Sequence, residues 1–403
     1  MSGPLEGFRI LDLSTVVMGP FATQILCDYG ADVIKVESPE GDIMRAAGPA
    51  LHQGMGHLYL TTNRGKRSIV IDLKHPDGRK ALLDLSQNAD AIVYNIRPQA
   101  MARLGLTYED LSAVNPRIIY VGAFGFSQRG PYADRPAYDD LIQGMSGIPW
   151  LSQQAGAETP RYAPMILADR MVGMMVANAL LSALLQRERT GRGQKIDVPM
   201  FESLVSIVLA EHLAGRLFEP AQGPVGYQRS MTPERRPYKT LDGYICTMVY
   251  SDKHWRAFLT AIGQPDIFDN DPRFSTHPAR HAHIAEVYRF LAEVIATRTT
   301  GEWLEIFGKG DIPVAPMYSI EDIINDEHLN AIGYFARQQH PTEGNIMSMA
   351  IPTEWSATPP DVPRHAPSLG ENTREILTGV GYSAEAIDAL AASGAIGTKP
   401  PPA

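Results

Sequence analysis

Asp169 is a carboxylate at the predicted start of a long helix. Asp169, in the segment LADRMVG, lies immediately before an apolar run with helical spacing. The free N–H groups and positive end of a helix favour negative charge, so this position predicts an ionised carboxylate beside a cradle for an oxyanion. Such a carboxylate can attack an activated acyl group and form a covalent intermediate. Local sequence alone favours an N-cap aspartate, and the two roles are compatible.

A second chemical signal is a basic segment in an acidic chain. Between residues 61 and 104, eight basic residues outnumber four acidic ones, a local charge of +4 within a net charge of −9. Guanidinium and ammonium groups are the usual partners of phosphates, so the segment predicts an anion site, with a solvated charged face as the alternative. The basic residues are Arg64, Lys66, Arg67, Lys74, Arg79, Lys80, Arg97 and Arg103.

Motifs of several other ligand classes are missing from the sequence. The first strand-to-helix turn has no GxGxxG, no P-loop surrounds Gly65-Lys66, and no GxSxG elbow occurs, which disfavours NAD binding, a P-loop site and serine hydrolase chemistry. The only histidine cluster comprises His277, His281 and His283; Pro278 interrupts it and no acidic ligand completes it. It therefore predicts a solvated helix start and no metal site.

Composition sets the class of protein. The chain has 403 residues, of which 44% are hydrophobic and 20% charged, as in a globular protein with two domains. The net charge of −9 disfavours nonspecific binding to nucleic acid or to an anionic membrane. The most apolar helical run, residues 171–185, is shorter than a bilayer span and predicts a core helix.

The N-terminus and the cysteines indicate the compartment. The first residues, MSGPLEGFRILDLS, lack a basic start followed by an apolar stretch of signal-peptide length. Cys27 and Cys246 lie in apolar sequences, far from metal-ligand spacing, which predicts two buried, unpaired thiols in a reducing compartment. Together these features predict a cytoplasmic protein.

The predicted secondary structure indicates where the anion site and the nucleophile would lie. A strand RILDLS, a turn at Gly19-Pro20, a helix FATQILCDYGA and a strand DVIKVE predict a right-handed βαβ unit with parallel strands. The theme continues through the strands SIVIDL, AIVYNI and RIIYVGAFGF, with helices beginning near Pro76 and ending before Gly105. The pattern predicts an α/β fold, a Rossmann-like open sheet with ligands at the carboxyl ends of its strands.

The rest of the chain predicts a second domain. Two long helices flank the strand KIDVPM, and a Pro- and Gly-rich stretch then leads to a hairpin-like YKTLDGYICTMVY and short amphipathic helices. We predict that residues 1–225 form the N-terminal part of a large α/β domain and residues 226–330 a smaller α+β domain. Residues 331–403 are expected to return to the large domain.

Seven ordered segments resemble those of the class III CoA-transferases, a family that includes formyl-CoA transferase, carnitine CoA-transferases and α-methylacyl-CoA racemases. They run from about Leu5 to Leu377. The resemblance implies coenzyme A thioesters as substrates, no prosthetic group, and an interlocked homodimer in which each subunit is threaded through the other. The segments are LSTVVMGPFATQILCDYGADVIKVESPEGD, TTNRGKRSIVIDLKHPDGR, NIRPQAMARLGL, GPYADRPAYDDLIQGMSG, LADRMVG, TGRGQKIDVPMFES and PSLGENTREIL.

The resemblance also implies roles for individual residues. Asp169 occupies the position of the family's nucleophilic aspartate. Ser38 replaces a basic residue that often follows the second strand in the family, a loss for which Arg45 or Arg64 could compensate. The positions similar to the family's CoA-binding residues are Val17, Met18, Lys74, Asn95, Arg97 and Arg103, with Tyr138 as a further substrate-binding residue.

Three functions stay open at this point. In a transferase, Asp169 would form a mixed anhydride with the donor acyl group and then an aspartyl-CoA thioester. A racemase of the same family needs a histidine acid/base where this chain has Tyr138, a poor base at neutral pH, so transfer is preferred; packing under the helix LIQGMSG is the alternative role of Tyr138. Asp139 and Asp140 are expected to cap a helix. A noncatalytic acyl-CoA-binding protein would have no need of Asp169.

The sequence also bears on which acids are exchanged. Formyl-CoA transferases carry a Gly-rich loop in the second domain, whereas the comparable stretch here, MVYSDKHW, has no glycine. Exchange between oxalate and formate is therefore disfavoured. We expect a short dicarboxylic acid as acceptor, with succinyl-CoA or a similar donor.

Overall fold

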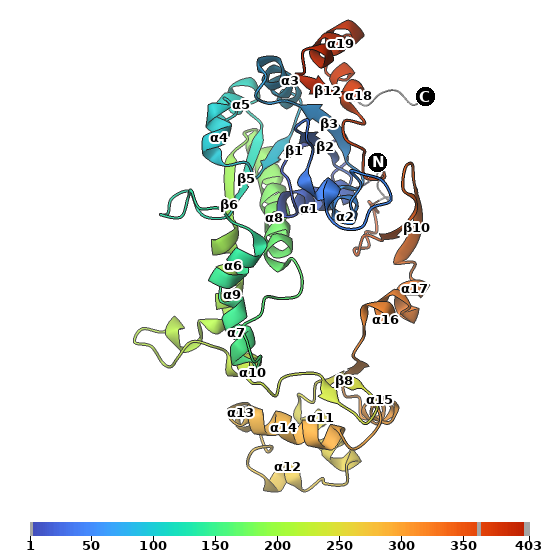
Figure 1. The fold of residues 1–403 in the computed structure, drawn as a ribbon. Coiled ribbons are helices and arrows are strands. Elements are labelled where there is room, and N and C mark those ends of the chain that lie inside the picture. The colour runs from blue at the N-terminus through green and yellow to red at the C-terminus, as the bar shows by residue number, and fades with distance from the viewer. Residues whose placement is uncertain (1–2, 361–363, 399–403) are drawn as a thin grey trace. The chain divides into compact units, whose positions relative to one another are not determined.

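The computed structural model describes residues 3–360 and 364–398, which form two compact units (Figure 1). Unit 1 is built from Met1–Ser146, Met165–Ser206 and Ala331–Ala403, and unit 2 from Gly147–Pro164 and Ile207–Asn330. Residues 331–398 thus lie with the N-terminal part of the chain. Residues 147–164 and 207–225, which the sequence analysis placed in the large domain, lie in unit 2. In the first of these segments, α7 (Ile148–Gln154) packs against α10 (Gln228–Met231) of unit 2.

Unit 1 is centred on a seven-stranded sheet with the order β12-β3-β2-β1-β4-β5-β6. All neighbouring strands are parallel except the edge strand β12, which pairs antiparallel with β3. This confirms the predicted α/β fold with a mostly parallel sheet. The strands are β1 Arg9–Leu13, β2 Asp32–Glu37, β3 Arg67–Ile71, β4 Ala91–Tyr94, β5 Ile119–Phe124, β6 Lys195–Pro199 and β12 Ile396–Gly397.

The sheet is buried on both faces by helices. Every residue of β4 and β5 is buried, as expected of parallel strands whose sequences are continuous apolar runs. A separate hairpin of β10 Phe335–His340 and β11 Gly344–Met349, which the sequence did not predict, belongs to the same unit. The helices are α1 Met18–Asp28, α2 His57–Asn63, α3 Pro76–Ser86, α4 Pro98–Arg103, α5 Tyr108–Val114, α6 Asp139–Met145, α8 Leu167–Thr190, α18 Thr373–Thr378 and α19 Ala384–Ala392.

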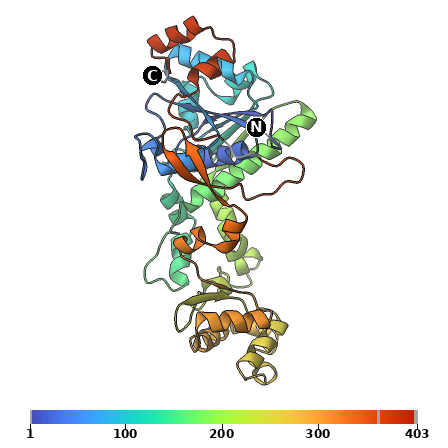
Figure 2. The same cartoon turned by 90° about the vertical axis from the view of Figure 1, so that its right-hand side faces the viewer.

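Helix α8 is longer than the run of residues 171–185 that predicted it. It has 24 residues, and in the described part of the chain it is the one helix long and apolar enough to cross a membrane by length and composition. The argument that this helix is too short to span a bilayer was therefore wrong. The evidence for a core helix is instead that Val172, Val176 and Leu180 are buried and that α8 packs along α1 (Figures 1 and 2).

Unit 2 has its own core. Its three strands form an antiparallel sheet in the order β7-β8-β9, and aromatic side chains such as Trp255, Phe258 and Trp303 are fully buried beside it. Helix α9, Met200–His212, contains the boundary between the two units. The other elements are α7 Ile148–Gln154, α10 Gln228–Met231, β7 Tyr238–Lys239, β8 Tyr244–Thr247, α11 Asp252–Ala261, α12 Ile267–Asn270, α13 His277–Ala282, α14 Ile284–Ile295, α15 Thr300–Lys309, β9 Val314–Pro316, α16 Ile320–Ile324 and α17 Glu327–Ala331.

The two cysteines differ in exposure. Cys27 is buried as predicted, whereas Cys246 is exposed, and both are free thiols. Cys246 lies on β8 next to the fully buried Ile245, and successive side chains of a strand point to opposite faces. The prediction of a buried Cys246 was wrong because an apolar sequence does not reveal which face of a strand is covered.

Candidate active site

The site begins where the strand order reverses. From β1 the chain moves outward to β2 and β3 on one side, and β4 and β5 lie on the other. The carboxyl ends of β1 and β4 are therefore the switch point of the sheet, the position at which open α/β sheets form a ligand crevice. Asn95, just after β4, bridges it: its side chain accepts the N–H of Thr15 at 3.0 Å and donates to the Thr15 carbonyl at 2.8 Å. Val17 and Met18, which are buried, begin α1 directly after this bridge.

The turn between β1 and α1 holds an unfavourable backbone conformation. Val16 has a φ of 74°, which is rare for a β-branched residue and marks a strained position. Its N–H donates to Asp42 at 3.2 Å, and Lys35 both pairs with Asp42 at 3.0 Å and donates to the Ser14 carbonyl at 2.9 Å. Gly19 closes the turn, because a Cβ there would lie 2.3 Å from the Ser14 side chain.

A buried charge network lies beneath this turn. Asp12 and Lys66 are fully buried and form an ion pair at 2.9 Å. Burial would raise the pKa of Asp12, but Lys66 and Lys35 hold it well below its usual range. Burial lowers the pKa of Lys66 to about 8 against the attraction of Asp12. Lys66 is therefore a structural residue and is not available to an external anion.

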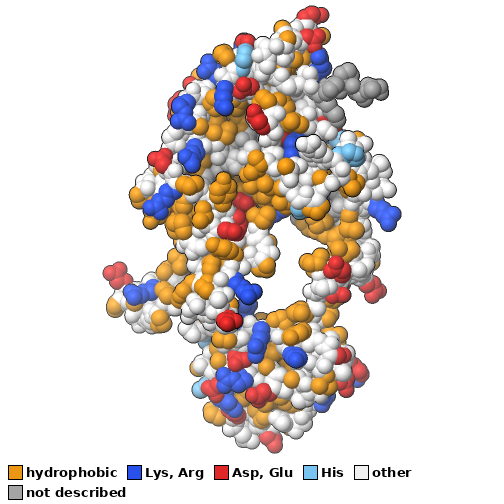
Figure 3. All heavy atoms as spheres, viewed as in Figure 1, with side chains coloured by type: hydrophobic (Ala, Val, Ile, Leu, Met, Phe, Trp, Pro, Cys, Tyr) orange, Lys and Arg blue, Asp and Glu red, His pale blue; other side chains and the backbone are white. Residues whose placement is uncertain are grey.

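The basic segment divides into paired and unpaired cations. Three of its members are held by carboxylates: Arg64 by Asp28 at 2.9 Å, Arg67 by Asp32 at 2.6 Å and Lys80 by Asp84 at 2.6 Å. Figure 3 shows further basic side chains on the side of unit 1 formed by α4 and α5. Among the eight cations of this segment, all of which the structure describes, the exposed side chains of Lys74, Arg97 and Arg103 have no hydrogen bond or ion pair.

The two proposed substitutes for a basic residue at Ser38 are already engaged. Arg45 is buried; it pairs with Glu37 at 2.7 Å and donates to the Pro367 carbonyl. Arg64 is held by Asp28 and also donates to the carbonyl of Met349. Neither guanidinium can turn to a phosphate without leaving a carboxylate behind, so the expectation that one of them compensates for Ser38 is not supported.

Asp169 lies in the first turn of α8, three positions after its N-cap residue, Ile166. The residue is only 9% exposed. Within the described ranges its carboxylate has no hydrogen bond or ion pair. Burial, followed by the charge of Asp139, raises its pKa from 3.8 to about 7, while Arg170 acts in the opposite direction. The helix end therefore does not keep Asp169 ionised as strongly as predicted, because burial outweighs it.

Asp139 has a capping role, but for a different helix from the one it begins. It is the first residue of α6, and one oxygen accepts the N–H of Asp169 at 2.9 Å, which satisfies a free donor of α8. Gln143 donates to its other oxygen. Asp140 is exposed. The sequence did not reveal the Asp139–Asp169 contact, because 30 residues separate the partners.

A glycine brings Asp169 to the crevice. Gly173 lies one helical turn after Asp169, and a Cβ at this position would be 2.8 Å from the Met18 carbonyl oxygen. Arg170 lies over the ring of Phe21 in α1 at 4.5 Å. The contact of α8 with the start of α1 therefore places the carboxylate of Asp169 near the strained turn.

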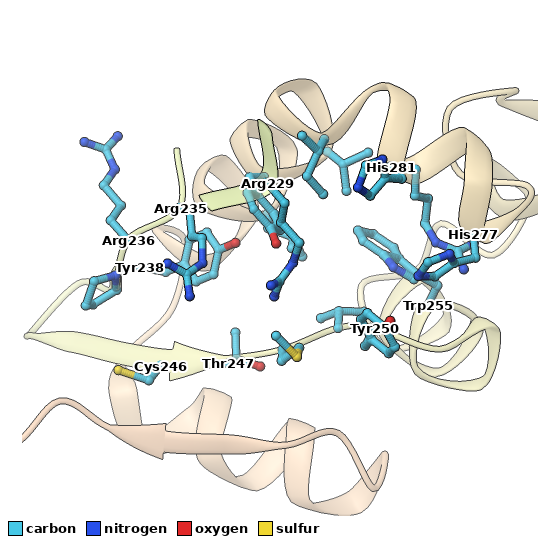
Figure 4. Close-up of a pocket in the computed structure, with 18 residues that line it drawn as sticks. Arg229, Arg235, Arg236, Tyr238, Cys246, Thr247, Tyr250, Trp255, His277 and His281 are labelled. Carbon is cyan, nitrogen blue, oxygen red and sulfur yellow. The ribbon is translucent and has the colours of Figure 1, made fainter. Parts of the chain in front are cut away.

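Tyr138 is the residue that precedes α6. Its side chain is 66% exposed, which rules out the alternative that it packs under the following helix. The histidines lie elsewhere: His277 and His281 are exposed and line a pocket of unit 2 (Figure 4). No group of three or more His, Cys, Asp or Glu side chains that could hold a metal occurs among the described residues.

The chain is similar to known proteins over nearly its whole length. The model of a family described as CoA-transferase family III matches residues 5–373. The chain is 35% identical over 384 residues to the succinate–glutarate CoA-transferase of Agrobacterium fabrum, covering 93% of this chain and 95% of that protein. It is 31% identical over 431 residues to a formyl-CoA:oxalate CoA-transferase of Escherichia coli, covering 98% and 100%. The crystal structure of a CAIB/BAIF family protein from Brucella suis matches with a TM-score of 0.78 at 30% identity, over 94% of this chain and 100% of that one.

Proposed function

Since the chain belongs to CoA-transferase family III and is a CoA-transferase, we propose that it moves coenzyme A from a donor acyl-CoA to a short dicarboxylic acid with Asp169 as nucleophile. One observation carries the assignment of Asp169: it is a nearly buried carboxylate without a hydrogen-bond partner among the described residues, in the first turn of a helix packed against α1. A buried carboxyl group that serves only structure normally has a hydrogen-bond partner.

The first half of the reaction forms the enzyme-bound CoA. The Asp169 carboxylate attacks the thioester carbon of the donor, the C–S bond breaks, and CoA leaves as a thiolate. The thiolate then attacks the aspartyl carbonyl of the resulting anhydride. The donor acid leaves as a carboxylate, and an aspartyl-CoA thioester remains.

The second half repeats these steps with the acceptor. Its carboxylate attacks the aspartyl thioester and releases the CoA thiolate, which attacks the acceptor side of the new anhydride. The products are the acceptor acyl-CoA and the free Asp169 carboxylate. No water and no net proton is consumed, which fits a nucleophile that is largely withdrawn from solvent.

The proposed CoA site extends from the crevice along the sheet edge. Val17 and Met18 would present backbone N–H groups at the start of α1, where a negative group is favoured. The unpaired cations would meet the phosphates, and the exposed Tyr138 would contact the substrate near Asp169. The residues proposed for the site are Val17, Met18, Lys74, Asn95, Arg97, Arg103 and Tyr138.

The identity of the acids and the assembly are also proposals. The choice of a dicarboxylic acid rests on the names of the relatives, succinate–glutarate and formyl-CoA:oxalate CoA-transferases. An interlocked homodimer is supported by exposed apolar side chains on unit 1, such as Leu141, Met165 and Leu185. We retain the cytoplasm as the proposed location.

Trapping the covalent intermediate tests the role of Asp169. With succinyl-CoA and no acceptor, the protein should gain the mass of CoA on the peptide that contains LADRMVG, and hydroxylamine should convert this adduct to a hydroxamate. Asp169→Asn should lose both adduct and transfer, since the amide keeps the shape but lacks the nucleophile. Asp140→Asn, which alters an exposed carboxylate of the neighbouring helix, is the control. Near-parental transfer by Asp169→Asn, or exchange of an α-proton without transfer, would favour a racemase.

A further inference from the structure

Side chains from β1, β2 and the end of β4 hold the backbone of the turn between β1 and α1. The N–H of Ser14 donates to Asp12 at 3.0 Å, and the Ser14 carbonyl accepts a hydrogen bond from the Lys35 ammonium at 2.9 Å. Asn95 binds both backbone polar groups of Thr15. The conformation of this turn is therefore imposed by side chains outside it.

Val16 is the strained member of the turn. Its φ of 74° lies in the left-handed region, which a β-branched residue keeps only where its surroundings impose it. Its N–H donates to one oxygen of Asp42 at 3.2 Å, and the other oxygen of Asp42 pairs with Lys35 at 3.0 Å. Because Lys35 also binds the Ser14 carbonyl, the Lys35–Asp42 pair holds the backbone on both sides of Thr15.

This ion pair is buried, with Lys35 0% and Asp42 2% exposed. Burial would lower the pKa of Lys35, but the nearby carboxylates of Asp12 and Asp42 raise it above its usual range, so the ammonium stays charged. A buried pair of charges stabilises a fold little, since the cost of removing both from water offsets their attraction. Asp42 also caps the 3-10 helix Ile43–Ala46 through the N–H of Met44, but a cap has no need of a buried lysine.

The turn leads directly to free backbone donors. In the part of the chain that the structure describes, the N–H groups of Val17, Met18 and Gly19 have no hydrogen bond, as is usual at the start of a helix. Val16 immediately precedes them, so its backbone conformation sets how these donors are directed at the end of β1.

We propose that Asp42, together with Lys35, is a positioning residue of the CoA site. The pair keeps Val16 in the left-handed conformation, and the N–H groups of Val17 and Met18 are thereby directed to the substrate before it binds. Neither Asp42 nor Lys35 contacts the substrate. A turn that is ordered in advance spares CoA the cost of ordering it. The inference rests on the proposed function, which places CoA against the start of α1.

The affinity of the full chain for CoA measures how well the turn is held. Asp42→Ala removes the acceptor of the Val16 N–H, and a turn that adopts the binding conformation about a tenth of the time binds about ten-fold more weakly. The Kd for CoA from calorimetric titration and the KM for every acyl-CoA donor should rise together by this factor, while the KM for the acid changes little. Asp42→Asn should keep more of the affinity than the alanine variant, because its amide oxygen accepts the same N–H.

Val16→Gly distinguishes positioning from a merely structural role. Glycine adopts a positive φ as readily as a negative one, so the turn reaches this conformation without the ion pair. In a chain that carries Val16→Gly, Asp42→Ala should therefore weaken CoA binding by about two-fold at most. If Asp42→Ala leaves Lys35 uncompensated and the chain unfolded, Lys35→Met/Asp42→Ala removes both charges and carries the same comparison.

Asp90→Asn is the matched control. Asp90 also accepts a backbone N–H, that of Arg9 at 2.6 Å, and also pairs with a buried cation, Arg187, at 2.8 Å. It lies at the amino ends of β1 and β4, the opposite edge of the sheet from the turn. This variant should lower thermal stability and leave the Kd for CoA at the parental value.

Two results would overturn the inference in different ways. If Asp42→Ala binds CoA with the parental Kd while Asn95→Ala, which frees Thr15 of the same turn, binds it more weakly, the ion pair is only structural and the proposed CoA site stands. If neither variant changes the Kd, the turn is not part of the CoA site, and that part of the proposed function falls with the inference. An equal loss of affinity from Asp42→Ala with valine and with glycine at position 16 also excludes a positioning role.

Discussion

At the scale of single residues, the decisive feature is the environment of Asp169. The motif predicts the residue but not its protonation, since burial and the nearby Asp139 raise its pKa to about 7. A weakly stabilised carboxylate is a better nucleophile than one held by ion pairs, provided that it is ionised at the working pH. The environment of Asp169 therefore links reactivity to pH.

The pH dependence of the reaction should report this environment. Because the carboxylate is the reactive form, kcat/KM for an acyl-CoA should rise about ten-fold per pH unit below about 7 and level off above it. Asp139→Asn removes the like charge and lowers the pKa of Asp169, so the rising limb should move to lower pH.

The test is to measure kcat/KM against pH for the wild-type chain and for Asp139→Asn. Asp140→Asn is the control and should leave the rising part of the profile at the wild-type pH. The asparagine of Asp139→Asn keeps one oxygen for the N–H of Asp169, so the first turn of α8 retains this hydrogen bond. A flat profile for the wild-type chain would contradict the link between Asp169 and pH.

At the scale of elements, the sequence predicted the strands and helices whose own residues carry a clear apolar pattern. The six parallel strands are runs of β-branched and aromatic residues between turn signals, and all of them are present. The hairpin of β10 and β11 was missed because FARQQH is mostly polar and GNIMSM has no continuous apolar run, and most of their residues are partly or fully exposed. The long helix predicted before KIDVPM is α8, and the apolar run of residues 171–185 is only its middle part.

The close contact between α8 and α1 positions Asp169, and a substitution at Gly173 tests this role. Gly173→Ala would place a methyl group 2.8 Å from the Met18 carbonyl oxygen, so the helices must move apart. Overpacking of this kind costs about 1–3 kcal/mol. Because Asp169 lies one turn away, kcat should fall together with thermal stability.

The matched control is Gly308→Ala in α15, where an added Cβ meets nothing within 4 Å. Alanine in such a helical position should stabilise the chain by about 0.4–1 kcal/mol and leave kcat unchanged. Differential scanning calorimetry and steady-state kinetics measure both effects. Equal behaviour of the two variants would show that the close approach at Gly173 has no part in positioning Asp169.

At the scale of the whole molecule, chain order and spatial order differ. Unit 1 collects three separate stretches of chain and unit 2 collects two. The sequence predicted the return of residues 331–403, because a Pro-rich stretch there leads into terminal helices. It did not place residues 147–164 in unit 2, because a short helix such as α7 carries no signal for the partner on which it packs.

The proposed interlocked dimer leads to a prediction about exchange. Leu141, Met165, Met174 and Leu185 are each 46% to 57% exposed on unit 1, and they are the apolar side chains that a subunit interface would bury. Chains threaded through each other cannot part without unfolding. Dilution should therefore leave the sedimentation coefficient of the dimer unchanged, and a mixture of tagged and untagged dimers should form no hybrids until denaturant is added.

A substitution in the apolar surface sharpens the test. Leu185→Asp should lower the yield of folded protein without producing a stable monomer, because threading couples folding to assembly. In a dimer of separately folded subunits, the same change would release folded monomers on dilution, and hybrids would form rapidly in the wild-type mixture. A folded, active monomer at any concentration would therefore overturn the interlocked assembly while leaving the chemistry at Asp169 intact, since that site is built within unit 1.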